Sequence, residues 1–311
     1  MKQIDKGSII IHALKPVRNS SIELLRILAA CAVVILHYNG MGKALYYSTG
    51  LSHELLIMLE CLCVCAVDLF IMISGYFLCQ KQQRTWDKPI YLLLLLSAIR
   101  LTIYVLGSYG DGYSIANLIH SFIPPKCYFI LLYIVLYIIS PYVNIVMNCL
   151  NAYGRTVLIL IMLILFSIYP TLIDSYEIMI HQNPMGVSTV GAWGQQHGYT
   201  IVGFVLFYAV GAWLRMNQIG EILSQRKIML LVLAIVLCIF IWFKVEEIFF
   251  HVGFSLVDYN SLSYTNPLVI FLTALLLLLF SKLSFQSNII NNLAKSTFVC
   301  YIFHLSLIPH L

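Results

Sequence analysis

Charged residues are scarce in this chain, and their scarcity excludes most soluble folds. They make up 10% of the sequence, whereas hydrophobic residues make up 61%. A soluble domain carries roughly 25% charged residues, so a chain of this composition could not cover a water-facing surface. Its 311 residues are instead expected to form membrane spans. The composition predicts an all-α polytopic membrane protein.

Three further signatures are missing. Before residue 20 the apolar patch Ile9–Ile11 is too short for a cleavable signal peptide, and the chain has no glycine-rich phosphate loop. Cys61, Cys63 and Cys65 lie close in sequence, but successive members would point about 200° apart on a helix. We therefore expect these cysteines to pack as small hydrophobes, and we expect no metal and no redox cofactor.

The apolar runs are continuous and do not alternate with polar residues, which indicates helices rather than barrel strands. Each is close to the roughly 20 residues that a membrane helix needs. The sequence predicts about nine spans, at 21–39, 55–78, 89–107, 128–147, 156–173, 199–214, 229–247, 267–283 and 296–311.

The distribution of lysine and arginine predicts the orientation. With the N-terminus in the cytoplasm, thirteen of these residues fall in cytoplasmic segments and two in outer segments. Such a bias in short loops sets the topology of membrane proteins. We expect a multi-pass protein of the cell (inner) membrane, with a cytoplasmic segment at 1–20 and one transmembrane domain at 21–311.

The outer connections are longer than the inner ones and mix aromatic residues with amides and carboxylates. Such surfaces suit sugar binding, but an interfacial aromatic belt with ordinary polar loops explains them as well. Both interpretations stay open for the segments 107–127, 174–198 and 246–266.

Ionisable residues inside predicted spans are costly and are therefore candidates for a functional site. Arg26 and His37 lie eleven residues apart in the first span, which is roughly 16 Å along a helix and nearly the same face. Glu60 and Asp68 lie in the second span, Glu60 near the expected depth of His37. A carboxylate beside His37 would fix its tautomer and raise its basicity.

Other polar residues in the spans extend this pattern. Ser74-Gly75 ends the second span's apolar block, where small residues allow helices to approach closely. Arg100 lies deep in the third span, and His304 lies in the last, preceded by Tyr301. These groups cannot face lipid, so together they predict a polar cavity in the bundle.

Several blocks in order resemble the membrane acyltransferase-3 family, which O-acylates cell-surface polysaccharides. The first is Arg26-x10-His37. The others are Val67–Leu78 with its Ser-Gly pair, Tyr128–Asn144, Phe207–Ala212, and Ala294–His304 with Tyr-x-x-His. The resemblance covers nearly the whole chain. The family usually has about ten spans, so we expect this chain to end one helix short.

The resemblance implies a cytoplasmic acyl-CoA donor, acetyl-CoA above all, and a surface glycan or lipid-linked sugar as acceptor, with membrane lipid but no nucleic acid as partners. His37 would act as general base on a sugar hydroxyl or as a transient acyl carrier. Asp68 or Glu60 would orient it, with His304 as a further catalytic candidate.

The donor side follows from the same resemblance. Arg26 and inner-loop cations would hold the donor's phosphates, and Ser74-Gly75 would shape the cavity wall. Some members carry an Arg-x-Arg pair around span three. It is absent here, and Lys88 and Arg100 are the nearest cations, so Arg100 is assigned to donor binding.

Two other functions stay open. A transporter of polysaccharide or lipid-linked glycan would also place charges in its spans, although no inverted repeat and no pair of broken helices is visible in the sequence. A catalytically inactive membrane scaffold is the third possibility. Dependence of the product on acyl-CoA would separate the enzyme from the transporter.

Overall fold

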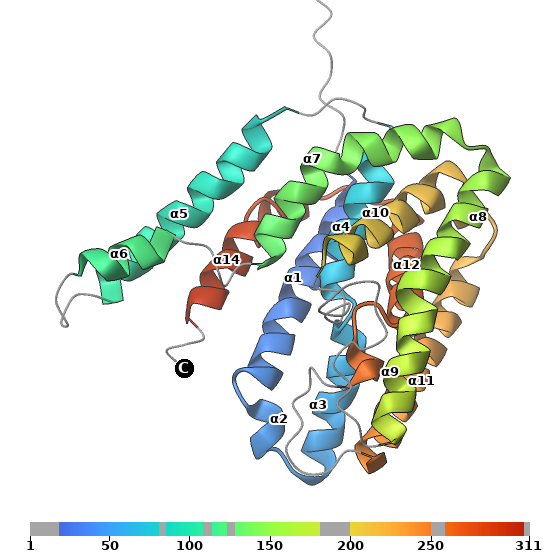
Figure 1. Cartoon of the computed structure of the whole chain (residues 1–311), viewed down its shortest axis with the longest axis horizontal. Coiled ribbons are helices and arrows are strands. Elements are labelled where there is room, and N and C mark those ends of the chain that lie inside the picture. Colours follow the sequence, from blue (N-terminus) through green and yellow to red (C-terminus); the bar gives the residue numbers. More distant parts are fainter. Residues whose placement is uncertain are drawn as a thin grey trace, which may run out of the picture.

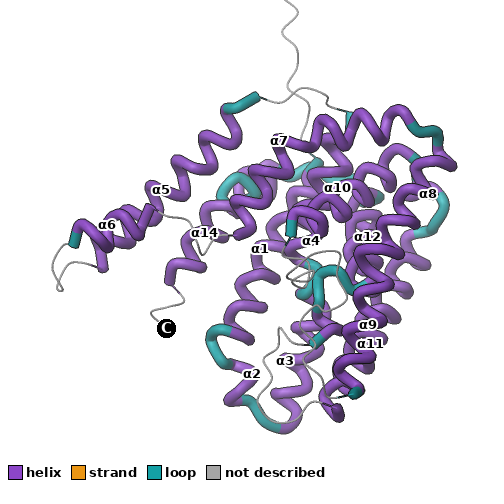
Figure 2. Tube along the Cα trace, in the orientation of Figure 1, coloured by secondary structure: helices purple, strands orange, loops and turns teal. Residues whose placement is uncertain are grey.

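A computed structural model describes residues 19–80, 85–107, 114–122, 128–180, 200–249 and 259–307. All regular elements within these ranges are helices (Figure 2), which confirms the all-α prediction. Much of the three decorated connections, at 108–113, 123–127, 181–199 and 250–258, lies outside the described residues. The choice between a sugar surface and an aromatic belt there stays open.

Seven helical stretches of the described chain are long and apolar enough to cross a membrane. They are α1 (Ser20–Gly40), α3 with α4 (Gly50–Cys63, Ala66–Leu78), α5 (Asp87–Gly107), α7 (Tyr128–Cys149), α8 through η1 to α9 (Ala152–Leu163, Ile164–Ile168, Tyr169–Met179), α11 (Gln225–Phe249), and η5 with α12 (Asn260–Leu262, Pro267–Ser281).

Two shorter apolar helices occupy the other predicted spans. They are α10 (Ile201–Met216) and α14 (Thr297–Leu307), and residues 308–311 of the last predicted span lie outside the described chain. Short helices lie in four connections of the described chain, namely α2 (Ala44–Tyr47), α6 (Ile115–Phe122), the 3-10 helix η3 (Ile219–Glu221) and α13 (Asn288–Leu293). Every predicted span thus overlaps a helix, and the chain is a multi-pass membrane bundle.

The second span is not one continuous helix. α3 ends at Cys63 and α4 begins at Ala66, with a turn at Val64 and Cys65 between them. The fifth span is also irregular, because η1 is a π-helical segment between α8 and α9. Hydropathy predicted both spans as uninterrupted helices, since it reports apolar character and carries no information on backbone geometry.

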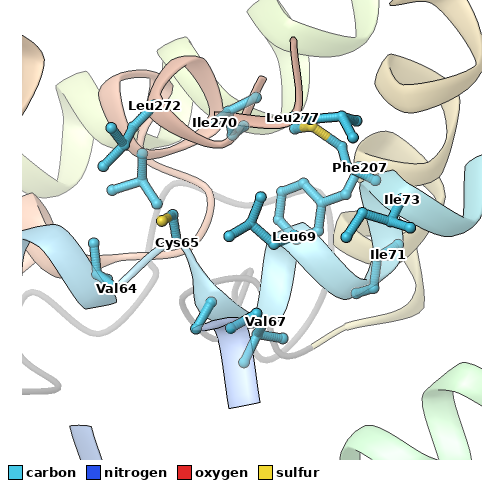
Figure 3. Packing of buried hydrophobic residues seen from close by; sticks show 14 of the residues in the cluster. Val64, Cys65, Val67, Leu69, Ile71, Ile73, Phe207, Ile270, Leu272 and Leu277 are labelled. Carbon is cyan, nitrogen blue, oxygen red and sulfur yellow. The ribbon is translucent and has the colours of Figure 1, made fainter. Parts of the chain in front are cut away.

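The core forms around α4, which packs against α1, α10 and α12 (Figure 1). Figure 3 shows Leu69, Ile71 and Ile73 of α4 beside Phe207 of α10, with Ile270 of α12 near them. α4 and α10 cross closely at two glycines. A Cβ on Gly75 would overlap the carbonyl oxygen of Tyr208, and a Cβ on Gly211 would overlap that of Met72.

Hydrogen bonds between connections define one end of the bundle. Ser20 at the start of α1 bonds Ser287 and Asn291, Asn148 of α7 bonds the Cys79 carbonyl, and the Arg155 side chain bonds Asn217. We call this the basic end, because Lys88, Arg155, Arg215, Lys282 and Lys295 lie in or beside these connections.

α5 and α6 project from one side of the described bundle (Figure 1). In Figure 1 they extend away from the central helices, with α14 lying between α5 and α1, and α14 contacts both of these helices. Only 22% of the apolar window of α5 is buried, against 72% for α3 with α4. α14 thus lies between α1 and the projecting helix α5 (Figure 1).

Candidate active site

α1 carries the two residues of the first-span motif. The side chain of Asn19 caps its first turn by accepting from the Ser21 amide, which satisfies one of the free amides at a helix start. His37 lies seventeen residues beyond Ser20, roughly 26 Å along the helix. The motif thus places Arg26 toward the basic end and His37 toward the opposite end.

His37 meets His304, and the two rings come from opposite ends of the sequence. His37 Nδ1 lies 2.8 Å from His304 Nε2. The ring centroids are 5.0 Å apart and the ring planes differ by 25°. Both residues were predicted as catalytic candidates from separate spans, and the structure brings them into hydrogen-bond contact.

His304 is held by its own helix and by aromatic neighbours. Its Nδ1 lies 3.2 Å from the Cys300 carbonyl oxygen, one turn earlier in α14. Tyr301 contacts its ring edge-on with centroids 5.6 Å apart, and Tyr301 in turn packs on Phe129 of α7. The imidazole therefore has a defined orientation toward His37.

In the described structure neither predicted carboxylate forms a hydrogen bond or an ion pair with His37. Glu60 is buried and accepts a hydrogen bond from Asn39, at 2.8 Å. Asp68 is 0% exposed, and neither of its oxygens has a hydrogen-bond partner among the described residues. Orientation of His37 by Asp68 or Glu60 stays a prediction, and the group that contacts the ring here is an imidazole.

Arg26 pairs with its neighbour one turn back. Its guanidinium lies 2.8 Å from Glu23, whose side chain is 8% exposed, while the Arg26 side chain is 33% exposed. The Glu23 carboxylate offsets part of the charge that would otherwise be available to a phosphate. Arg26 still lies near the basic end, where the donor was expected.

A second polar group, which we call the lysine–tyrosine cluster, consists of Lys88, Tyr133, Tyr137 and Ser74. Lys88 Nζ donates to the Tyr133 hydroxyl at 2.9 Å, and that hydroxyl lies 3.2 Å from Ser74 Oγ. The ammonium also lies over the rings of Tyr133 and Tyr137, 5.1 and 5.3 Å from their centroids. These are cation–π contacts.

Sequence reasoning had placed Ser74 in this region but had given no role to Tyr133. The tyrosine was visible only as one aromatic residue in the Tyr128–Asn144 block. A similar contact lies nearby, where Arg215 is 3.4 Å from the Tyr76 hydroxyl and 5.2 Å from its ring centroid. Cations beside aromatic rings therefore occur twice at the basic end.

The remaining donor candidates lie in different settings. Gly75 faces the Tyr208 backbone at the α4–α10 crossing, so its side-chain position is filled by helix packing. Arg100 is twelve residues beyond Lys88 in α5, roughly 18 Å along the helix. The structure thus separates Arg100 from the lysine–tyrosine cluster.

The accessible group in this arrangement is the other nitrogen of His37. No described residue bonds Nε2 of His37, and this atom is not among the buried unpartnered atoms of the described chain. An imidazole with one nitrogen held and the other free can take a proton from a hydroxyl. The geometry suits abstraction of a proton from a hydroxyl.

Comparison with known proteins gives the family. The sequence profile of an acyltransferase family, described as "Acyltransferase domain", matches residues 19–309. No curated protein and no solved structure matches the chain. The profile spans nearly all of the chain, including α1 with His37 and α14 with His304. The chain therefore belongs to the acyltransferase-3 family and is a multi-pass membrane acyltransferase.

Proposed function

We propose that this acyltransferase moves an acyl group, acetyl in the first instance, from acyl-CoA to a hydroxyl of a cell-surface polysaccharide or of its lipid-linked precursor. His37 serves as the general base. The observation that carries the proposal is the pairing of His37 with His304, which holds Nδ1 and leaves Nε2 free. Family membership supplies the reaction class.

In the proposed reaction, His37 carries a proton from the acceptor hydroxyl to the CoA sulfur. His37 Nε2 removes the proton from the acceptor hydroxyl, whose oxygen bonds to the carbonyl carbon of the thioester. The carbon–sulfur bond then breaks, and the CoA sulfur takes the proton back from Nε2. The products are an O-acyl ester and a free thiol, and His37 returns to its starting state.

The basic end is the proposed entry for the donor. Lys88 and Arg215 can hold phosphate oxygens through charge-assisted hydrogen bonds, and the tyrosine rings beside them offer a flat surface for a base. An aromatic path leads from there toward the histidines, because Tyr133 packs on Phe129 and Phe129 packs on Tyr301. The thioester arm of the donor would lie along this path.

The proposal includes the orientation of the protein in the membrane. The excess of lysine and arginine at the basic end supports a cytoplasmic location for it in the cell membrane, where acyl-CoA is made. His37, roughly 26 Å along α1 from Ser20, would then meet an acceptor from the outer half of the membrane. This arrangement lets donor and acceptor approach the site from opposite sides.

The test uses the full-length protein, purified and reconstituted in phospholipid vesicles. Acetyl-CoA is supplied with surface polysaccharide from the source cells, and both thiol release and ester-linked acetyl are measured. We expect the two to appear together in equal amounts and to be lost in His37→Ala. Thiol release that does not depend on the glycan, or no release at all, would contradict the proposal.

Transport of a glycan is the competing function, and the same vesicles test it. A transporter would move labelled glycan across the membrane without acyl-CoA and would leave no ester on it. Among the described spans, only the one formed by α3 and α4 has a turn between two α-helices, whereas a pair of broken helices marks many transporters. The family match favours the transferase.

A further inference from the structure

The hydrogen bonds around His304 carry information on which nitrogen of His37 reacts. His304 Nδ1 lies 3.2 Å from the Cys300 carbonyl oxygen. A carbonyl oxygen can only accept a hydrogen bond, so Nδ1 must be the protonated nitrogen of His304. In the neutral ring, Nε2 is then an acceptor.

The contact between the two rings then sets the tautomer of His37. His304 Nε2 lies 2.8 Å from His37 Nδ1. Since the His304 nitrogen accepts, His37 Nδ1 must donate and therefore carries the proton. Neutral imidazole has one N–H, which leaves the lone pair of His37 at Nε2. One backbone carbonyl in α14 thus sets the tautomer of a ring in α1.

We propose that His304 is a positioning residue that holds His37 in the Nδ1–H tautomer, so that Nε2 is the atom that takes the proton from the acceptor hydroxyl. The inference rests on the proposed function for its chemical role, but the tautomer itself is a property of the protein alone. A carboxylate performs this task in many histidine-based sites. Here a neutral imidazole, itself fixed by the Cys300 carbonyl, takes that place.

A neutral partner differs physically from a carboxylate. When His37 gains a proton, a carboxylate would attract the new charge strongly, whereas His304 offers only a lone pair and a dipole. His304 therefore fixes the direction and tautomer of His37 and adds less basicity than a charged partner would. The buried Asp68 and Glu60 form no hydrogen bond or ion pair with the two histidines in the described structure, which is consistent with this division of roles.

Two substitutions separate positioning from packing. His304→Gln keeps a side-chain oxygen that can accept from His37 Nδ1–H, whereas His304→Phe keeps a ring of similar size without an acceptor. We expect His304→Phe to lower turnover by about 10²-fold, the cost of a misplaced catalytic group, with the KM for acyl-CoA unchanged. His304→Gln should retain most of the turnover, and His53→Gln, a histidine bonded to Ser48 elsewhere, serves as a matched control.

A spectroscopic readout tests the tautomer independently of activity. The full-length protein is labelled with ¹⁵N-histidine, and the His37 signals are assigned by comparison with His37→Ala. We expect an unprotonated Nε2 and a protonated Nδ1 in the wild type, with this preference weakened in His304→Phe. A His37 protonated at Nε2, or equal turnover in the two His304 variants, would overturn the inference. An inactive wild type with the expected tautomer would contradict the proposed function alone.

Discussion

The bundle holds two polar regions that differ in charge and in neighbours. The lysine–tyrosine cluster at the basic end combines a cation with aromatic rings and hydroxyls. The histidine pair between α1 and α14 contains two imidazoles and no charged partner among its described contacts. The first region suits recognition of an anion, and the second suits transfer of a proton.

Under the proposed function, the bundle binds the donor in one region and transfers the proton in the other. Phosphate recognition needs fixed positive charge, but a cation beside a general base would hinder its protonation. The aromatic contacts from Tyr133 through Phe129 to Tyr301 lie between the two regions and keep the lysine away from the imidazoles. Changes in the two regions should therefore affect different kinetic constants.

The largest effect is expected at the histidine pair. His37→Ala should lower turnover by about 10²- to 10⁴-fold, the usual contribution of a general base, while the KM for acyl-CoA stays unchanged. Steady-state kinetics on the reconstituted protein measure both constants. His53→Ala is the control, and a parallel rise in the KM for the donor would show that the two regions are not separate.

The next effect is expected at the α4–α10 crossing, where two helix backbones approach closely. Gly211→Ala places a methyl group where the Met72 carbonyl lies, so the helices must move apart, at a cost of about 1–3 kcal/mol as in overpacked cores. Thermal unfolding in detergent measures the loss. Gly220→Ala is the matched control, because its Cβ would lie 3.5 Å from Leu278 in ordinary contact. Equal midpoints for the two variants would contradict the close crossing.

A smaller effect is expected at the lysine–tyrosine cluster. Lys88→Met should raise the KM for acyl-CoA by about 10-fold, equivalent to ~1.4 kcal/mol, since one charge-assisted contact with the donor is lost. Turnover at saturating donor should stay near that of the wild type. Lys295→Met, at the same end but bonded to Asn292, is the control. A fall in turnover with unchanged KM would place Lys88 in the chemistry instead.

The smallest effect is expected at an ion-pair cluster that belongs to neither region. Lys244 of α11 lies 2.9 Å from Glu54 of α3 and 2.6 Å from Glu247, and all three side chains are partly exposed. Lys244→Met should lower the free energy of unfolding by only about 0.2–1 kcal/mol and change neither kinetic constant. A large kinetic defect would show that the histidine pair depends on this cluster.

The sequence predicted most of the fold, because an apolar run of about 20 residues indicates a helix that crosses the membrane. It predicted α1, α5, α7 and α12 closely. It missed the turn at Val64 and Cys65 and the π segment Ile164–Ile168, since neither changes hydropathy. Apolar periodicity reports where a chain is buried, while these features depend on how neighbouring helices supply partners for the backbone.

The sequence named both histidines as candidates but did not predict that they meet, and their catalytic role stays a prediction. His37 and His304 were both identified, yet only the packing of α14 against α1 brings them together. The sequence suggested a carboxylate for His37 because Glu60 lies at a similar depth, and depth alone cannot say which way a side chain faces. Tyr133 was missed because one tyrosine in an aromatic-rich span carries no distinguishing signal.

The most direct test of the central claim is the mass of ester-linked acyl groups on surface glycan from three sets of cells, which make the wild-type chain, the His37→Ala variant or neither. The account predicts acylation with the wild type and its loss in both other sets, with equal amounts of protein in the membrane. Acylation that persists with His37→Ala would contradict it, and so would glycan that changes in amount but never carries the ester.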